Sequence, residues 1–174
     1  YKKVSTNLNF VEREKETAQF WKDHDIFKKS IETREGDPVY TFYDGPPTAN
    51  GKPHIGHVLT RVIKDMIPRY RTMKGYMVPR KAGWDTHGLP VELGVEKALH
   101  ITKEDIGKTI SVAEYNAACR KDVMKFTKEW TDLTHKMGYW VDLENPYITY
   151  DNRYIETLWW LLKPVSYTHL RAHE

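Results

Sequence analysis

The sequence predicts an α/β fold in which parallel strands are joined by a helix and preceded by a helical arm. Three observations support this prediction. Residues 39–43 form a β-branched and aromatic run of strand length. A stretch with helical periodicity follows at 55–75, and a second short strand-like run follows at 76–79. Strand, helix and strand in this succession are typical of a right-handed parallel crossover, so both strands should end at the same edge of the sheet.

The composition is that of a globular domain. Of the 174 residues, 40% are hydrophobic and 29% are charged, and the formal net charge is only +3. This balance excludes intrinsic disorder and does not by itself predict a nucleic-acid partner. We expect no membrane segment, because the sequence contains no run of about 18 apolar residues. The single cysteine, Cys119, excludes an internal disulfide framework and fits a reducing compartment.

The amino-terminal part is predicted to be one helix over about residues 9–34. Asn9 can cap this helix, with Glu12 as the capping-box partner three residues on. The strand at 39–43 then ends at Asp44. A loop must follow over residues 45–53, because three prolines and two glycines in this segment permit neither a helix nor a strand ladder.

The helix predicted over 55–75 has an apolar stripe at helical spacing, which predicts that it lies on the sheet. Pro68 should kink this helix or end its first part, and Gly75 should close it. The second strand, 76–79, leads into a loop over 83–90. The stripe consists of Ile55, Val58, Leu59, Val62, Ile63, Met66 and Ile67.

The rest of the chain is predicted to be mainly helical. A short helix and a connection fill residues 86–108, and apolar residues spaced by three or four predict one continuous helix over 112–137. Cys119 lies on the apolar face of that helix, so we interpret it as a core residue and not as a nucleophile. Asp151 should cap a last apolar helix, which Pro164 should end.

Basic residues are concentrated between positions 61 and 81, where Asp65 is the single acid. We interpret this cluster as a solvated helix face, with direct nucleic-acid contact as the alternative. The basic residues are Arg61, Lys64, Arg69, Arg71, Lys74, Arg80 and Lys81.

Two histidines mark the start of the long helix. His54 and His57 are three residues apart, beside the unpaired N–H groups and the positive dipole end of the helix, which favour a phosphate. Gly56 leaves room for a flat ring against the backbone, while Thr48 and Asn50 can reach the same anion. Imidazole donors in this place can stabilise the charge on a displaced phosphate. The alternatives are two surface residues, a zinc half-site or a helix cap.

The loop that follows the second strand contains Asp85. Because parallel α/β sheets bind ligands beyond the carboxyl ends of their strands, Asp85 is a candidate to bind a cation such as an ammonium group. The alternative is an N-cap of the following helix, and His87 is interpreted as a packing or surface residue. Neither a GxGxxG nor a GxxxxGK[ST] pattern occurs, which argues against dinucleotide and P-loop sites.

Two segments carry a family resemblance. Residues 45–57 (GPPTANGKPHIGH) and 83–92 (GWDTHGLPVE) resemble the amino-terminal part of the isoleucyl-tRNA synthetases, which are class I aminoacyl-tRNA synthetases with a His-Ile-Gly-His signature. The signature alone is shared with other nucleotidyltransferases, whereas the longer segments are more specific. Residues 138–142 and 147–150 resemble the family as well, and the resemblance extends from about residue 7 to Lys163.

The resemblance implies the first half of a class I synthetase Rossmann-like parallel-sheet nucleotide-binding domain, behind an N-terminal helical arm. It also implies that ATP and isoleucine react to isoleucyl-adenylate and pyrophosphate, and that the isoleucyl group is then transferred to tRNA(Ile). By the same resemblance, His54 and His57 bind the ATP phosphates and stabilise the transition state. Thr48 and Asn50 assist them, and Gly56 packs beneath the adenine.

The amino-acid pocket is also assigned by resemblance. Gly45 and Pro46 would form part of it, and Asp85 would hold the α-ammonium group of the substrate. The implied partners are isoleucine, ATP with Mg²⁺ and tRNA(Ile). We expect a cytoplasmic monomer that contacts no membrane. We expect no metal site here, because the zinc sites of the family lie outside this sequence, as do its Lys-Met-Ser-Lys-Ser loop, editing insertion and anticodon-binding domain.

The sequence is therefore expected to be a fragment with three parts. Residues 1–36 form the helical arm, and residues 37–163 form the incomplete nucleotide-binding domain. Residues 164–174 depart from the family and resemble a translated read-through of a sequencing adapter. Alone, the fragment should be inactive. Two alternatives stay open, namely a small nucleotidyltransferase that uses the same His-x-Gly-His phosphate site and an inactive remnant that binds ATP or RNA.

Overall fold

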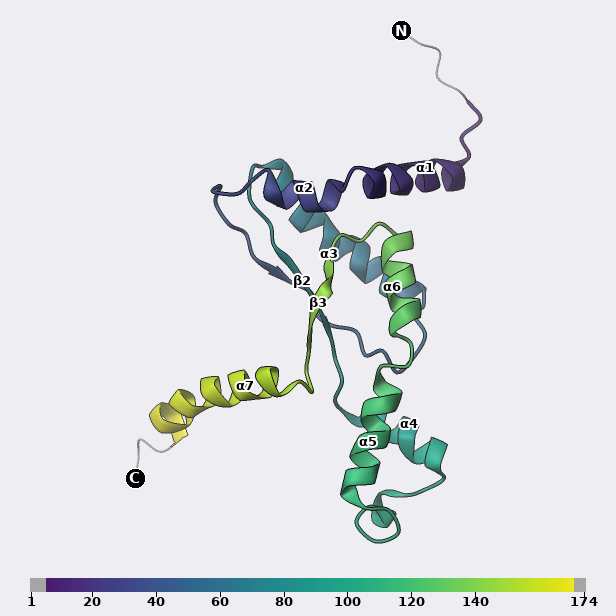
Figure 1. The fold of residues 1–174 in the computed structure, drawn as a ribbon, viewed down its shortest axis with the longest axis vertical. Helices are drawn as coiled ribbons and strands as arrows, with labels where there is room; N and C mark the ends of the chain where they lie inside the picture. Colours follow the sequence, from purple (N-terminus) through teal and green to yellow (C-terminus); the bar gives the residue numbers. More distant parts are fainter. Residues whose placement is uncertain (1–5, 171–174) are drawn as a thin grey trace. The chain divides into compact units, whose positions relative to one another are not determined.

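The structure is a computed structural model that describes residues 6–170 (Figure 1). It forms two compact units. The first contains the chain up to Phe42 together with Ile55–Arg80 and Asp132–Trp140. The second contains Tyr43–His54, Lys81–Thr131 and the chain from Val141 onward. Residues 1–5 of the predicted arm and residues 171–174 of the predicted tail lie outside the described residues.

The amino-terminal segment of the first unit is two helices, so the prediction of one helix over 9–34 is wrong. Helix α1 (Phe10–Asp23) begins at Asn9, whose side chain accepts from the backbone N–H of Glu12, as predicted. The helix is then interrupted at Asp25, which adopts the left-handed conformation with φ 49°. Helix α2 (Ile26–Glu32) follows. Periodicity alone did not reveal this break, because Asp25 is polar and left the apolar pattern undisturbed.

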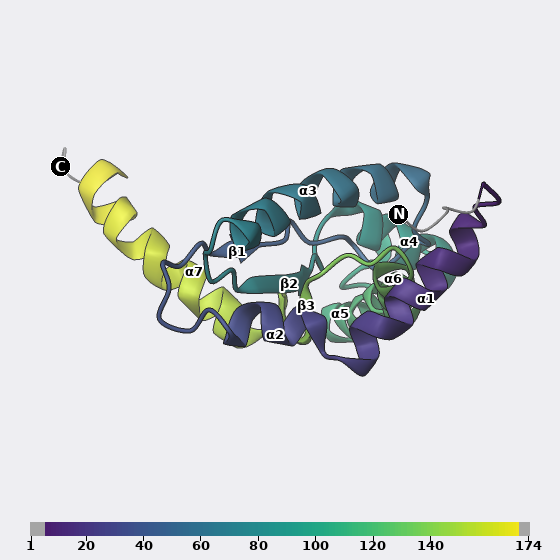
Figure 2. The same ribbon diagram turned by 90° about the horizontal axis from the view of Figure 1, so that it is seen from above.

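Helix α3 (Ile55–Met73) is one continuous helix (Figure 2) and contains Pro68. Gly75 follows its end with a positive φ. The predicted contact between its apolar stripe and the sheet is wrong. Ile55 is 81% exposed, and the stripe residues at 59, 62, 63, 66 and 67 are exposed too. The buried positions of α3 form the opposite, polar face, and these are Arg61, Asp65, Pro68 and Thr72.

This polar face is buried because its charges find partners within the first unit. Asp65 accepts from Arg69 Nε and, at 3.2 Å, from Arg80 Nη1. Arg61 donates to Thr134. The guanidinium of Arg69 also lies 4.0 Å from the ring centroid of Trp140. The interpretation of the basic cluster as a solvated face is therefore wrong for these three arginines.

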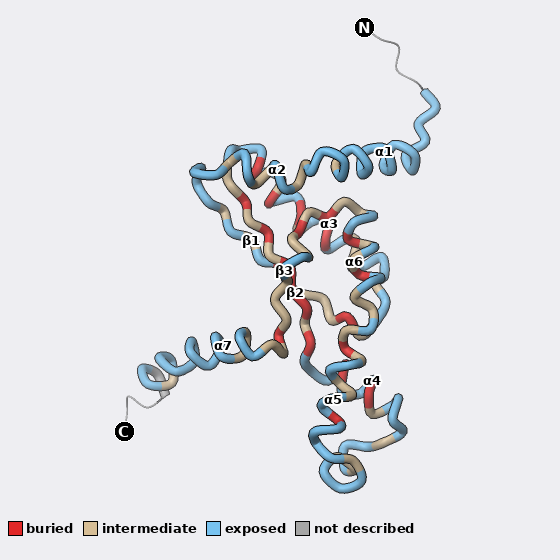
Figure 3. The backbone as a smooth tube through the Cα atoms, in the orientation of Figure 1, coloured by how far each residue is buried: buried red, intermediate tan, exposed pale blue. Residues whose placement is uncertain are grey.

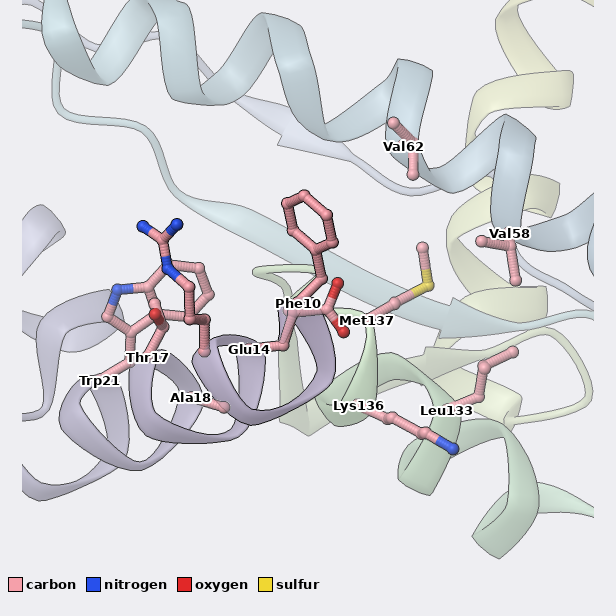
Figure 4. Close-up of a pocket in the computed structure, with 12 residues that line it drawn as sticks. Phe10, Glu14, Thr17, Ala18, Trp21, Val58, Val62, Leu133, Lys136 and Met137 are labelled. Atoms are coloured by element: carbon pink, nitrogen blue, oxygen red, sulfur yellow. The ribbon is translucent and has the colours of Figure 1, made fainter. Parts of the chain in front are cut away.

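An aromatic cluster holds α1 in the first unit. Trp21 meets Trp140 edge to face, with ring centroids 5.0 Å apart. Gly138 is required beside it, because a Cβ there would lie 2.8 Å from the Trp21 ring. Figure 4 shows the side chains of Phe10, Trp21, Val62 and Met137 around a cavity of about 600 Å³ in the same unit.

Three strands form a parallel sheet in the order β1-β2-β3, with β1 at Phe42–Tyr43, β2 at Arg80–Trp84 and β3 at Asp142–Ile148. The second strand was predicted at 76–79, which is too early. Charged Arg80 and Lys81 concealed it from the pattern, although Arg80 is only 2% exposed. The parallel pairing of the first two strands is confirmed, since Val39 bridges Met77 in the same direction.

The second unit contains helices α4 (Leu89–Leu99) and α5 (Val112–Val123), which pack side by side (Figure 1), with a 3-10 turn at Lys103–Asp105 between them. Helix α4 and the connection after it are confirmed. The continuous helix predicted over 112–137 is wrong, because a second helix, α6, begins at Thr127 and ends at Lys136. The break exists because Phe126 donates its backbone N–H to the carbonyl of Ala49 at 3.0 Å instead of to its own helix.

The last helix, α7 (Asn152–Val165), is capped by Asp151, whose carboxylate accepts from the backbone N–H of Arg153. This cap is confirmed. The predicted end at Pro164 is wrong by a short margin, because the helix includes this residue and a π-helical turn, Ser166–Leu170, continues from it. None of the described side chains of α1 or α7 is buried, and Figure 3 shows both helices without buried residues.

Candidate active site

The strand ends that carry the predicted loops meet in the second unit. Asp44 donates its N–H to the carbonyl of Lys81 at 2.9 Å, and Asp85 donates to Pro47 at 3.0 Å. Thr48 and Asp85 form a parallel bridge. The prediction that both strands end at the same edge is therefore confirmed. The second loop begins at Asp85, because residues 83 and 84 belong to β2.

The loop after β1 is anchored to the core of the second unit. Ala49 is completely buried and clusters with Trp84 and Trp130. The indole of Trp130 donates to the carbonyl of Gly51 at 2.9 Å. Because these contacts hold positions 49 and 51, the half-buried Thr48 and Asn50 between and beside them have defined places in the loop.

Tyr147, whose role was not predicted, contacts the backbone directly before Gly45 and Pro46, the candidate residues of the amino-acid pocket. Tyr147 donates its hydroxyl to the carbonyl of buried Asp44, and its ring lies flat on Gly83. Burial is the main cause that raises the pKa of Tyr147 to about 12, and the negative charge of Asp44 is the next. The hydroxyl therefore keeps its proton. Gly45 itself is exposed, and no described atom would lie within 4 Å of a Cβ there. Pro46 beside it is half-buried.

Asp85 is half-buried, and its Oδ1 accepts from the backbone N–H of His87 at 3.3 Å. The alternative interpretation of Asp85 as a helix cap is wrong, because Gly88 occupies the N-cap position of α4. His87 is exposed and its Nδ1 lies 2.9 Å from Thr149 Oγ1. The carboxylate of Asp85 thus lies at the edge of the sheet, on a turn that is bound to Thr149 through His87.

The two histidines are placed at the start of α3. His54 directly precedes the helix and is exposed, whereas His57 is half-buried in its first turn and belongs to the first unit. Gly56 lies between them in the same turn and is exposed. The first turn contains no acidic residue. The positive end of the helix dipole therefore favours a bound anion at this turn.

Two further findings concern chemistry that the site does not use. Burial raises the pKa of the Cys119 thiol, which therefore stays protonated at neutral pH and is a poor nucleophile. Within residues 6–170, no three His, Cys, Asp or Glu side chains gather in a way that could hold a metal ion. Over the same part of the chain, no helix is both long and apolar enough to cross a membrane.

Sequence reasoning missed Tyr147 and Thr149, which contact the backbone beside the two candidate loops. Both residues lie at the carboxyl end of β3, a strand that was not predicted. The strand contains Asn145 and Pro146, which normally signal a turn, and this concealed it. The signal that could have revealed it is the aromatic and β-branched run over 147–150.

Comparison with known proteins defines the family. Residues 16–169 match the model of the class I tRNA synthetases (I, L, M and V), and the chain belongs to this family. Within it, the chain is 70% identical over 156 residues to the isoleucine–tRNA ligase of Porphyromonas gingivalis, which covers 90% of the chain and 14% of that protein. It is 72% identical over 149 residues to the isoleucine–tRNA ligase of Bacteroides fragilis strain ATCC 25285, covering 86% of the chain and 13% of that protein.

A more distant relative has the same name. The isoleucine–tRNA ligase of Clostridium novyi is 55% identical over 163 residues, with 94% of the chain and 16% of that protein covered. The chain thus spans about one seventh of the length of the curated relatives it matches. The LeuRS of Agrobacterium radiobacter K84, solved as a ternary complex with tRNA and LeuAMS, shares the fold with a TM-score of 0.61 and 19% identity. This match covers 86% of the chain and 17% of that protein.

Proposed function

We propose that this chain is the amino-terminal part of an isoleucine–tRNA ligase. The protein would activate isoleucine with Mg²⁺-ATP to isoleucyl-adenylate and pyrophosphate, and would then transfer the isoleucyl group to the 3′ end of tRNA(Ile). We propose further that it acts as a cytoplasmic monomer. The observation that carries the proposal is the 70% identity to the isoleucine–tRNA ligase of Porphyromonas gingivalis over 90% of the chain.

The chemistry of the first step agrees with the residues at the sheet edge. A carboxylate oxygen of isoleucine attacks the α-phosphorus of ATP, and the bond to the leaving pyrophosphate breaks. No proton needs to be transferred to or from the protein in this step. We assign His54 and His57 the role of donating hydrogen bonds to the phosphates, where negative charge grows in the transition state. Thr48 and Asn50 supply further polar groups, and Gly56 lets the adenine approach the backbone.

The amino-acid end would be bound by the second unit. The carboxylate of Asp85 is an acceptor for the α-ammonium group of isoleucine. The open space above Gly45 admits the substrate beside Pro46. The parallel bridge between Thr48 and Asp85 supports this assignment, because it joins the phosphate-binding loop directly to the ammonium-binding residue.

The test is amino-acid-dependent exchange of labelled pyrophosphate into ATP by the full-length protein. Isoleucine should support exchange, and valine should support it less well, because an apolar pocket detects a missing methylene only modestly. The 174-residue chain alone is the control and should show no aminoacylation. Exchange that depends on a different acceptor would support a small nucleotidyltransferase instead. A folded full-length protein without any exchange would support an inactive nucleotide-binding remnant.

A further inference from the structure

We propose that Thr149 is a positioning residue for Asp85, and hence for the ammonium end of the amino-acid substrate. This inference rests on the proposed function, because it assumes that the carboxylate of Asp85 holds the α-ammonium group. Thr149 follows β3 directly and is buried, with 8% of its surface exposed. Its hydroxyl contacts Thr86 and His87, so it would act on Asp85 through these neighbours and not on the substrate itself.

The hydroxyl of Thr149 lies at the centre of three hydrogen bonds. Its Oγ1 accepts from the backbone N–H of Thr86 at 3.0 Å. It also lies 2.8 Å from Thr86 Oγ1 and 2.9 Å from His87 Nδ1. A hydroxyl has one proton and two lone pairs, so these three partners use its full capacity. Rotation of the Thr149 side chain away from this position would break these bonds.

These bonds enclose Asp85 on both sides along the chain. The backbone N–H of Thr149 donates to the carbonyl of Trp84 at 3.2 Å, and the Thr149 hydroxyl holds the N–H of Thr86. Residues 84 and 86 are therefore both anchored to position 149. The N–H of Asp85 is itself bound to Pro47. The backbone on both sides of Asp85 is therefore restrained, and this keeps its side chain at the sheet edge.

The carboxylate is oriented through His87. The backbone N–H of His87 donates to Asp85 Oδ1, while the ring of the same residue is bound to the Thr149 hydroxyl. Thr149 thus fixes the residue that fixes one carboxylate oxygen. Loss of the hydroxyl would leave the N–H of buried Thr86 without its acceptor and would release the turn. The expected consequence is weaker binding of the group that Asp85 holds, with the ATP phosphates unaffected.

The experiment compares Thr149→Val and Thr149→Ser in the full-length protein by pyrophosphate exchange. Valine has nearly the same shape but no hydroxyl, whereas serine retains the hydroxyl. Thr149→Val should raise the KM for isoleucine about tenfold, the equivalent of one or two lost hydrogen bonds, with the KM for ATP changed less than about twofold. Thr149→Ser should restore the isoleucine KM to within about twofold of the wild type.

A matched control separates positioning from general loss of stability. Thr72 is equally buried in the first unit, where its hydroxyl donates to the carbonyl of Pro68 and accepts from Arg80. Thr72→Val should lower the unfolding temperature and leave both KM values unchanged. Should Thr149→Val fail to fold, His87→Ala decides the question, because His87 is exposed and its ring can be removed without a buried cavity. It should raise the isoleucine KM about threefold.

The proposal is overturned if Thr149→Val, or His87→Ala in its place, leaves the isoleucine KM unchanged. It is also overturned if the KM values for isoleucine and ATP rise together, since this would indicate a general structural role. If the wild-type protein shows no isoleucine-dependent exchange, the proposed function itself is refuted and this role falls with it. Wild-type exchange combined with an unaffected isoleucine KM in the variant would refute the role of Thr149 alone.

Discussion

Replacement of Asp65 by asparagine tests the buried charge network of the first unit. The side chain of Arg80 is fully buried, and its nearest acid is Asp65, with Nη1 and Oδ1 3.2 Å apart. Burial, the largest cause, lowers the pKa of Arg80 to about 10 against the opposing effect of Asp65, so the guanidinium remains charged at neutral pH. Within the described residues, Arg80 Nε has no hydrogen-bond partner. Asp65→Asn would thus leave a poorly solvated charge without its counter-ion.

The magnitude follows from this geometry. Two charges 3.2 Å apart attract each other by about 5 kcal/mol at an effective dielectric constant of about 20. Removing one partner of a buried pair costs about 3–5 kcal/mol, a large part of the stability of a typical domain. Asparagine keeps one acceptor oxygen, so only one of Arg69 and Arg80 can retain its hydrogen bond, and Arg69 loses its counter-ion as well.

The assay is hydrogen exchange of peptides from α3 and β2 in the full-length protein. A cost of about 3–5 kcal/mol in local opening corresponds to exchange that is faster by about 10² to 10³-fold or more. Glu32→Gln is the matched control, because Glu32 forms an exposed pair with Lys28 and such pairs contribute little. Adding Arg80→Met to Asp65→Asn should restore part of the protection, because the unpaired charge is removed. If Asp65→Asn exchanges no faster than Glu32→Gln, the reasoning is refuted.

Three further predictions concern the second unit. Gly83→Ala places a Cβ 2.3 Å from Tyr147 Cζ and should destabilise the protein by about 1–3 kcal/mol in thermal unfolding. The additional substitution Tyr147→Val should relieve this effect, and an unchanged unfolding midpoint of Gly83→Ala would contradict the prediction. Asp85→Asn keeps the shape of the side chain but not its charge, and should raise the isoleucine KM by about 10 to 100-fold in exchange assays, whereas an equal rise for ATP would contradict the assignment. Hydrogen bonds from Ser111 hold the pKa of Glu114 below its ordinary value of 4.5, so their contribution to stability is present above about pH 4.5 and is lost at lower pH. The unfolding midpoint of Glu114→Gln should therefore vary less between about pH 6 and about pH 3 than that of the wild type. An identical pH profile for the two proteins would count against the capping box.

The sequence predicted those parts of the fold that depend on local chemistry. The caps at Asn9 and Asp151, the loop of prolines and glycines after β1, and the helix that follows it are all confirmed. The shared edge of the first two strands is confirmed as well, since Thr48 bridges Asp85. These features are set by a few neighbouring residues, so they can be recognised in the chain without knowledge of its tertiary contacts.

The features that failed depend on contacts between distant residues. Polarity suggested that Arg61 and Arg80 face water, but Thr134 and Asp65 make their burial possible. The break between α5 and α6 depends on a hydrogen bond from Phe126 to the loop at position 49. A periodicity argument treats polar residues as exposed and apolar ones as buried, and α3 reverses both assignments.

For the candidate site, the sequence indicated the loops but not the residues that hold them in place. The residues that resemble the family lie in loops at strand ends and at a helix start, where backbone geometry can be read from Gly, Pro and His spacing. Tyr147 and Thr149 stand behind those loops on a strand that Pro146 concealed. Their importance arises only when the third strand is placed beside the second, through the pairing of Trp84 with Ile148.

The most direct test of the account is the rate of isoleucine-dependent pyrophosphate exchange in the full-length protein with and without the His57 ring. The account predicts exchange by the wild type and a loss of about 10² to 10³-fold in kcat for His57→Ala, equivalent to about 2.7–4 kcal/mol of transition-state stabilisation. The unfolding temperature should be little changed, because His57 is not fully buried. Equal rates for the two proteins would contradict the assignment of this histidine to the phosphate site.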